Sequence, residues 1–87
     1  MTVHTITTTE QMILEPFPEK REVVFSLGYI SDATGNVLIR VGAGQADIVM
    51  AQYNAAITRV PIPQSTPVFA KTTAGTATLA VYIIPKD

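Results

Sequence analysis

The chain has 87 residues and a formal net charge of −1, which predicts one small domain without the basic surface that nucleic acid or anionic lipid would require. It contains no cysteine and a single histidine, so disulfides are excluded and a structural zinc site is not expected. Hydrophobic residues make up 47% of the chain, but they never form the run of about eighteen that a transmembrane helix needs. We therefore expect neither a nucleic-acid partner nor a membrane partner.

The scarcity of charge is the most informative feature of the composition. Only 15% of the residues are charged, against about a quarter in ordinary soluble domains. A small monomer depends on a well-charged surface for its solubility, and a core of this size supplies only about 3–5 kcal/mol. Both points indicate that other subunits cover part of the surface, and we expect a homo-oligomer.

The first twenty residues predict an extended arm and a connector. Residues 2–9 are rich in threonine, and a short apolar run follows at residues 11–14 before Pro16 and Pro18 break the regular structure. We expect residues 1–20 to lie outside a domain formed by residues 21–87. The arm either crosses a neighbouring subunit as an added strand or frays in solution.

The centre of the chain predicts a β-hairpin. Residues 21–30 form a strong strand, residues 31–36 a polar turn, and residues 36–41 a returning strand. In the returning strand, Val37, Ile39 and Val41 point to one face, because side chains alternate along a strand.

The stretch Arg40–Val49, "RVGAGQADIV", raises the question of a phosphate-binding loop. No lysine follows Gly44, as a P-loop requires, and Asp47 stands where a dinucleotide fingerprint needs its third glycine. We interpret the glycines as turn residues. The following residues 47–56 are open between a helix capped by Asp47 and a strand at 48–50, and the strand is favoured.

The last third of the chain predicts three more strands. Residues 57–62 are extended, and Pro61 places them at a sheet edge. Residues 66–71 form another strand, residues 72–75 a turn, and residues 76–84 a final strand. In that strand the inward face is expected to be Ala77, Leu79, Val81 and Ile83. Valine and isoleucine occur eighteen times and leucine four times, and β-branched side chains favour strands. The fold class is therefore all-β, a small antiparallel β-sandwich or barrel of jelly-roll-like form with an extended N-terminal arm.

No combination of residues predicts catalysis, a metal site or a cofactor. His4 has no nucleophile or acid near it in sequence, and no serine sits in a nucleophile elbow. Asp32 and Asn36 are better explained as turn residues than as calcium ligands. The acidic residues around the two prolines are interpreted as a solvated connector: Glu10, Glu15, Glu19 and Glu22. We expect a protein that is not an enzyme.

The aromatic residues divide into core and surface candidates. Phe25 and Phe69 are expected in the core, whereas tyrosine is favoured at interfaces. One function for exposed tyrosines is a groove on a ligand-binding β-module for a cell-surface glycan or protein, built from Tyr29, Tyr53 or Tyr82.

The arm, the strands rich in Val, Ile, Thr and Ala, the absence of cysteine and the closing "GTATLAVYIIPKD" resemble small virion structural proteins of tailed bacteriophages. Capsid cement or decoration proteins are the most similar kind. The resemblance implies a non-enzymatic protein, synthesised in the host cytoplasm, that associates symmetrically, with a trimer favoured. It would bind the major capsid protein on the capsid surface of the virion. The candidate interface residues are Thr5, Thr7, Thr9, Tyr53, Tyr82 and Ile84.

Overall fold

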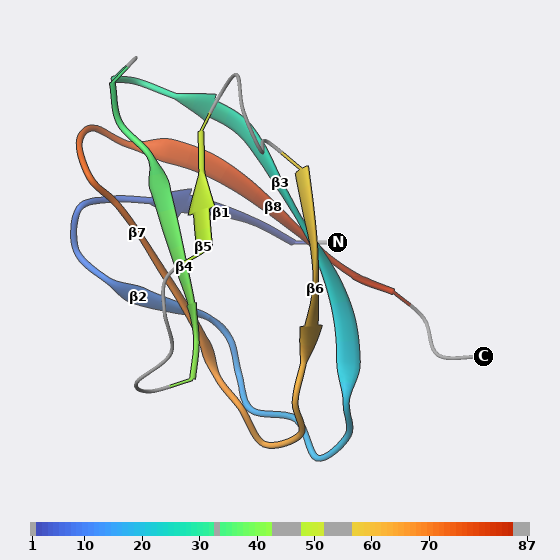
Figure 1. The fold of residues 1–87 in the computed structure, drawn as a ribbon. Coiled ribbons are helices and arrows are strands. Elements are labelled where there is room, and N and C mark those ends of the chain that lie inside the picture. Colours follow the sequence, from blue (N-terminus) through green and yellow to red (C-terminus); the bar gives the residue numbers. More distant parts are fainter. Residues whose placement is uncertain (1, 33, 43–47, 52–56, 85–87) are drawn as a thin grey trace.

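The structure, a computed structural model, describes residues 2–32, 34–42, 48–51 and 57–84. These residues form eight strands and no helix (Figure 1). The strands are β1 (Thr2–Ile6), β2 (Gln11–Leu14), β3 (Arg21–Ile30), β4 (Val37–Val41), β5 (Ile48–Met50), β6 (Ile57–Ile62), β7 (Val68–Thr72) and β8 (Ala77–Ile84). Within these ranges nothing forms a helix of the length and hydrophobicity needed to cross a bilayer.

The strands form two four-stranded antiparallel sheets that pack as a sandwich. Sheet A has the order β1-β8-β3-β6, and sheet B has the order β2-β7-β4-β5. The expected all-β sandwich is therefore confirmed. Both sheets are held by antiparallel ladders alone, the arrangement that allows one face of each sheet to pack and the other to meet solvent.

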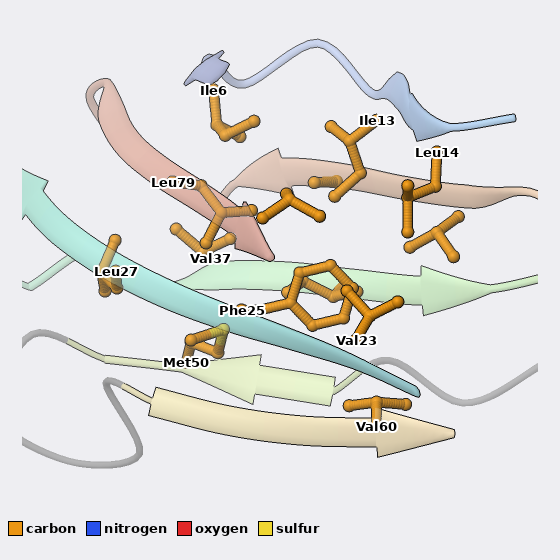
Figure 2. Packing of buried hydrophobic residues seen from close by; sticks show 14 of the residues in the cluster. Ile6, Ile13, Leu14, Val23, Phe25, Leu27, Val37, Met50, Val60 and Leu79 are labelled. Atoms are coloured by element: carbon orange, nitrogen blue, oxygen red, sulfur yellow. The ribbon is translucent and has the colours of Figure 1, made fainter. Parts of the chain in front are cut away.

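The core lies between the sheets and follows from the alternation of side chains. In β3, Val23, Phe25 and Leu27 are buried, while their neighbours along the strand face outward. Figure 2 shows Phe25 in the middle of the buried cluster, with Met50 of β5 contributed by the opposite sheet. Burial of a large apolar side chain contributes about 1.5–3 kcal/mol, so this cluster is the main source of stability.

The predicted hairpin between residues 21–30 and 36–41 is wrong. β3 belongs to sheet A and β4 to sheet B, so the connection between them crosses from one layer to the other. The crossing is fixed by bonds to the second crossing, from β7 to β8. The Ser31 amide donates to the Thr76 carbonyl at 2.8 Å, and the Thr73 amide donates to the Asn36 carbonyl at 2.9 Å. The hydrophobic pattern determines which face of a strand is buried, but it does not determine the partner strand.

The N-terminal segment is placed differently from the expected arm. β1 pairs with β8 in sheet A, and β2 pairs with β7 in sheet B, so residues 1–20 contribute one strand to each layer. The physical reason is that Ile6, Ile13 and Leu14 are buried in the common core. A bond from the Thr72 amide to the Thr7 carbonyl at 2.8 Å holds the connection between them.

Other expectations have mixed outcomes. The strand at residues 48–50 is confirmed, and residues 52–56 of the alternative helix lie outside the described part. β6 is an edge strand, as Pro61 predicts.

Ile83 was expected on the inward face but is 42% exposed, because it lies beyond the last buried residue of β8. Phe69 was expected in the core but is only half-buried, because it pairs with Arg40 on the outer face of sheet B.

Candidate interaction surface

The outer face of sheet A is the most unusual surface of the molecule. It consists of the residues of β1, β8, β3 and β6 that alternate with the buried ones, and the register brings them into cross-strand rows. One row runs from Val3 through Ala80 and Ser26 to Ile57. We call the whole set the sheet A face: Val3, Thr5, Glu22, Val24, Ser26, Tyr29, Ile57, Arg59, Pro61, Thr78, Ala80, Tyr82 and Ile84.

The sheet A face is apolar and carries little charge. The exposed fractions are 71% for Ile57, 60% for Val3, 59% for Tyr29 and 46% for Tyr82. Its only charged side chains, Glu22 and Arg59, form an ion pair with each other. Soluble monomers rarely expose an extended apolar area of this kind unless it binds something. The low charge of the sequence is therefore evident on this side of the sandwich, where one ion pair stands among apolar side chains.

Three of the six predicted interface residues come together on this face. Thr5 lies opposite Thr78 on β8, and Tyr82 and Ile84 lie further along the same strand. Thr7 and Thr9 lie instead in the connection from β1 to β2, where the Thr9 amide donates to Thr7 Oγ1 at 3.2 Å. Tyr53 lies outside the described residues.

Sequence reasoning missed the two most exposed apolar residues of the face, Val3 and Ile57. Both belong to edge strands, one at each side of sheet A. The available signal was their alternation with buried neighbours, Ile6 in β1 and Val60 in β6. Only the strand order places them on the same surface.

A groove of about 950 Å³ opens at the end of the sandwich where β3 begins and β6 and β8 end. Phe17, Pro61, Pro63 and Ile83 give it apolar walls, and both acidic and basic side chains stand among its lining residues. Arg21 shapes the groove, since its guanidinium carbon lies 4.9 Å from the centre of the Phe17 ring and one of its nitrogens donates to the Glu15 carbonyl at 2.9 Å. None of the described residues that line this groove is a tyrosine, so Tyr29 and Tyr82 do not form the expected glycan-binding groove here, and Tyr53 lies outside the described residues.

The outer face of sheet B is organised around Arg40. Its guanidinium carbon lies 4.9 Å from the centre of the Phe69 ring, and it forms an ion pair with Glu10. Because Glu10 precedes β2 and Arg40 lies in β4, this pair spans β7 and ties three strands together. Met12 and Val49 are exposed on either side, so this face, like the sheet A face, has one ion pair among exposed apolar side chains.

The candidate catalytic and metal-binding residues make structural contacts. His4 Nε2 lies 3.2 Å from Thr2 Oγ1, and Ser31 Oγ accepts a hydrogen bond from the Thr76 amide at 2.8 Å. Asp32 accepts bonds from the Thr34 hydroxyl at 2.8 Å and from the Thr34 amide at 2.9 Å. These two bonds stabilise the carboxylate and lower the pKa of Asp32. Asp32 therefore acts as a turn residue, as predicted.

The described ranges contain no group of three or more His, Cys, Asp or Glu residues placed to hold a metal ion. Comparison with protein-family models, curated proteins and solved structures gives no match for this chain. The inference about function therefore depends on the surfaces described above.

Proposed function

We propose that the protein is a non-enzymatic structural protein that works by associating through the sheet A face. The observation that carries the proposal is the combination of Ile57, Val3, Tyr29 and Tyr82 on one side, each 46–71% exposed, with a single internally neutralised ion pair. When such a face is covered, each apolar side chain that it buries contributes favourably, and only the one ion pair loses hydration.

The size of the face supports the same proposal. The principal extents of the fold are 37 × 26 × 18 Å, so the broad side measures about 37 × 26 Å. Stable interfaces bury roughly 800 Å² on each partner. A single broad side of this sandwich, strands and connections together, is therefore large enough for one standard interface.

A capsid cement or decoration protein is the particular form of this function that we propose. The composition and the closing strand resemble such proteins, and a broad sheet face with little charge suits repeated contacts on a symmetric shell. In this form the protein is a homo-oligomer, with a trimer favoured, and it binds the major capsid protein on the virion surface. Capsid, portal or terminase genes beside its own gene would agree with this assignment, and a neighbourhood of unrelated metabolic genes would contradict it.

The experiment replaces single residues of the sheet A face by lysine and measures the mass of the native assembly. We expect Tyr82→Lys and Ile57→Lys to shift the protein toward the monomer in light scattering across a concentration series, with circular dichroism unchanged. The matched control is Gln64→Lys, an exposed position in the connection between β6 and β7. A wild-type protein that stays monomeric at high concentration and does not sediment with icosahedral shells of its own phage would refute the proposal.

The groove favours a second candidate, a ligand-binding β-module. Its walls are apolar around Phe17 and Ile83, and its charged rim would give a ligand polar contacts. Under this candidate, Phe17→Ala and Ile83→Asp abolish binding to a peptide or glycan array, while Tyr82→Lys leaves it unchanged. Arrays on which the wild type binds nothing would remove this candidate and would leave the sheet A proposal untouched.

A further inference from the structure

The four edge strands of the sandwich differ in how well they are protected against pairing with another strand. β6 carries Pro61 and Arg59, and Pro63 follows it. β2 has four residues and a break in register between Met12 and Leu14, and β5 has three residues. Prolines, charges, irregularities and short length are the usual means by which proteins prevent edge-to-edge association.

β1 lacks the prolines, the charges and the irregularity that protect the other edges. Its five residues, Thr-Val-His-Thr-Ile, pair with β8 in unbroken register on one side, and on the other side no strand of the described chain is paired with it. It contains no proline, no glycine and no Lys, Arg, Asp or Glu, and three of its residues are exposed. The main-chain groups of the outer edge of β1 are therefore available as a template for a further strand.

We propose that β1 pairs antiparallel with β1 of a second copy of this chain, across a two-fold axis. Full overlap places His4 opposite His4 of the other copy and Val3 opposite Thr5 of the other copy. A second copy fits because β1 contains no Lys, Arg, Asp or Glu, so two copies bring no like charges of these side chains against each other across the axis.

The pairing also extends the sheet A face. Val3 and Thr5 belong to that face, so joining two copies at β1 turns two four-stranded sheets into one eight-stranded sheet with a continuous apolar side. The inference rests on the proposed function, because it identifies one contact through which the assembly grows. The β1–β1 contact joins two chains only. It can therefore link two copies, or two trimers, but it does not by itself form a trimer.

The contact between two β1 strands is small, and its size determines the protein concentration at which the pairing is populated. Five residues at about 3.4 Å each make an edge roughly 17 Å long, well below the area of a standard interface. The pairing is therefore weak between free molecules and becomes populated when copies are held close together, as on a lattice, where the effective concentration reaches the millimolar range.

The test uses the absence of native cysteine. In His4→Cys, the two thiols face each other across the axis, since directly opposed residues have Cα atoms about 4.5–5.5 Å apart, within the range that a disulfide spans. We expect a disulfide-linked dimer on a denaturing gel after mild oxidation at about millimolar protein concentration, where the weak pairing is populated, formed about tenfold faster than in the control Gln64→Cys. Equal rates for the two variants would overturn the inference.

Hydrogen exchange provides a second measurement on the unmodified chain. In a single copy, the β1 amides that point away from β8 exchange quickly, and the pairing protects them as the protein concentration rises. Exchange of these amides that does not depend on concentration also overturns the inference. The two proposals fail separately, because Tyr82→Lys and Ile57→Lys test the sheet A face without replacing any residue of β1.

Discussion

Replacing Gly75 by alanine tests the contact between the two connections that cross from one sheet to the other, β3 to β4 and β7 to β8. Gly75 has a φ of 72°, in the left-handed region that an alanine side chain disfavours. A Cβ atom at this position would lie against Ser31 Oγ and 3.0 Å from Asp32 Cβ. The Ser31 hydroxyl cannot yield freely, since it accepts the bond from the Thr76 amide.

The expected cost is the sum of two effects. The left-handed backbone costs an alanine about 1–2 kcal/mol, and displacing Ser31 Oγ weakens a hydrogen bond that contributes about 0.5–1.5 kcal/mol. Together they destabilise the fold by about 2–3 kcal/mol. For a domain of this length, that loss lowers the melting temperature by about 10–20 °C.

The assay is urea unfolding followed by circular dichroism, with Gly28→Ala as the matched control. A Cβ at Gly28 would meet only the Thr78 carbonyl at 3.5 Å, an ordinary contact, so we expect that variant to remain within about 0.5 kcal/mol of the wild type. Ser31→Ala should partly relieve Gly75→Ala in a double-mutant cycle, because it removes the clashing oxygen. A Gly75→Ala protein as stable as Gly28→Ala would refute the reasoning.

Three further predictions concern stability. Phe25→Ala, at a fully buried site, should cost about 3–5 kcal/mol in urea unfolding, whereas Phe17→Ala at a 44% exposed site should cost less than half as much; equal losses would contradict the assignment of the core. Arg40→Ala should lower the melting temperature by about 4–8 °C, the equivalent of roughly 1 kcal/mol for the partly exposed ion pair and the stacked ring, and a stability unchanged within error would show that the outer face of sheet B does not depend on it. The pKa of Asp32 is lowered in the folded state, so its contribution is present above the unfolded value of about 3.9 and is lost as the pH falls through the folded value; the stability difference between the wild type and Asp32→Asn should therefore shrink in acid, and a difference that is constant with pH would argue against it.

The strands themselves could be predicted because their signals are local. The alternation of Val23, Phe25 and Leu27 with more exposed residues identifies β3 and its buried face from the sequence alone. The partner strands could not be predicted in this way. Residues 31–36 have the composition of a hairpin turn, and the same residues equally well connect two layers when β8 and β7 supply the pairing.

The candidate surface was partly predictable for the same reason. The scarcity of charge indicates that some face is covered, and the alternation in β8 puts Tyr82 and Ile84 on the outward side. Adding Val3 and Ile57 requires the strand order, which depends on contacts between residues far apart in the chain. The N-terminal segment was assigned to an arm because Pro16 and Pro18 look like a boundary, although the buried Ile6 joins it to the core.

The position of β8 has a consequence for the order in which the protein acquires its structure during synthesis. β8 is the last of the eight strands to leave the ribosome, yet it lies inside sheet A between β1 and β3. Sheet B has all its strands once β7 has emerged. Sheet A lacks its interior strand β8 until translation of the described chain is nearly complete. Ile6 and Phe25 therefore cannot be fully buried until β8 has been synthesised. A ribosome stalled before residue 77 would leave the nascent chain with exposed apolar surface that chaperones recognise.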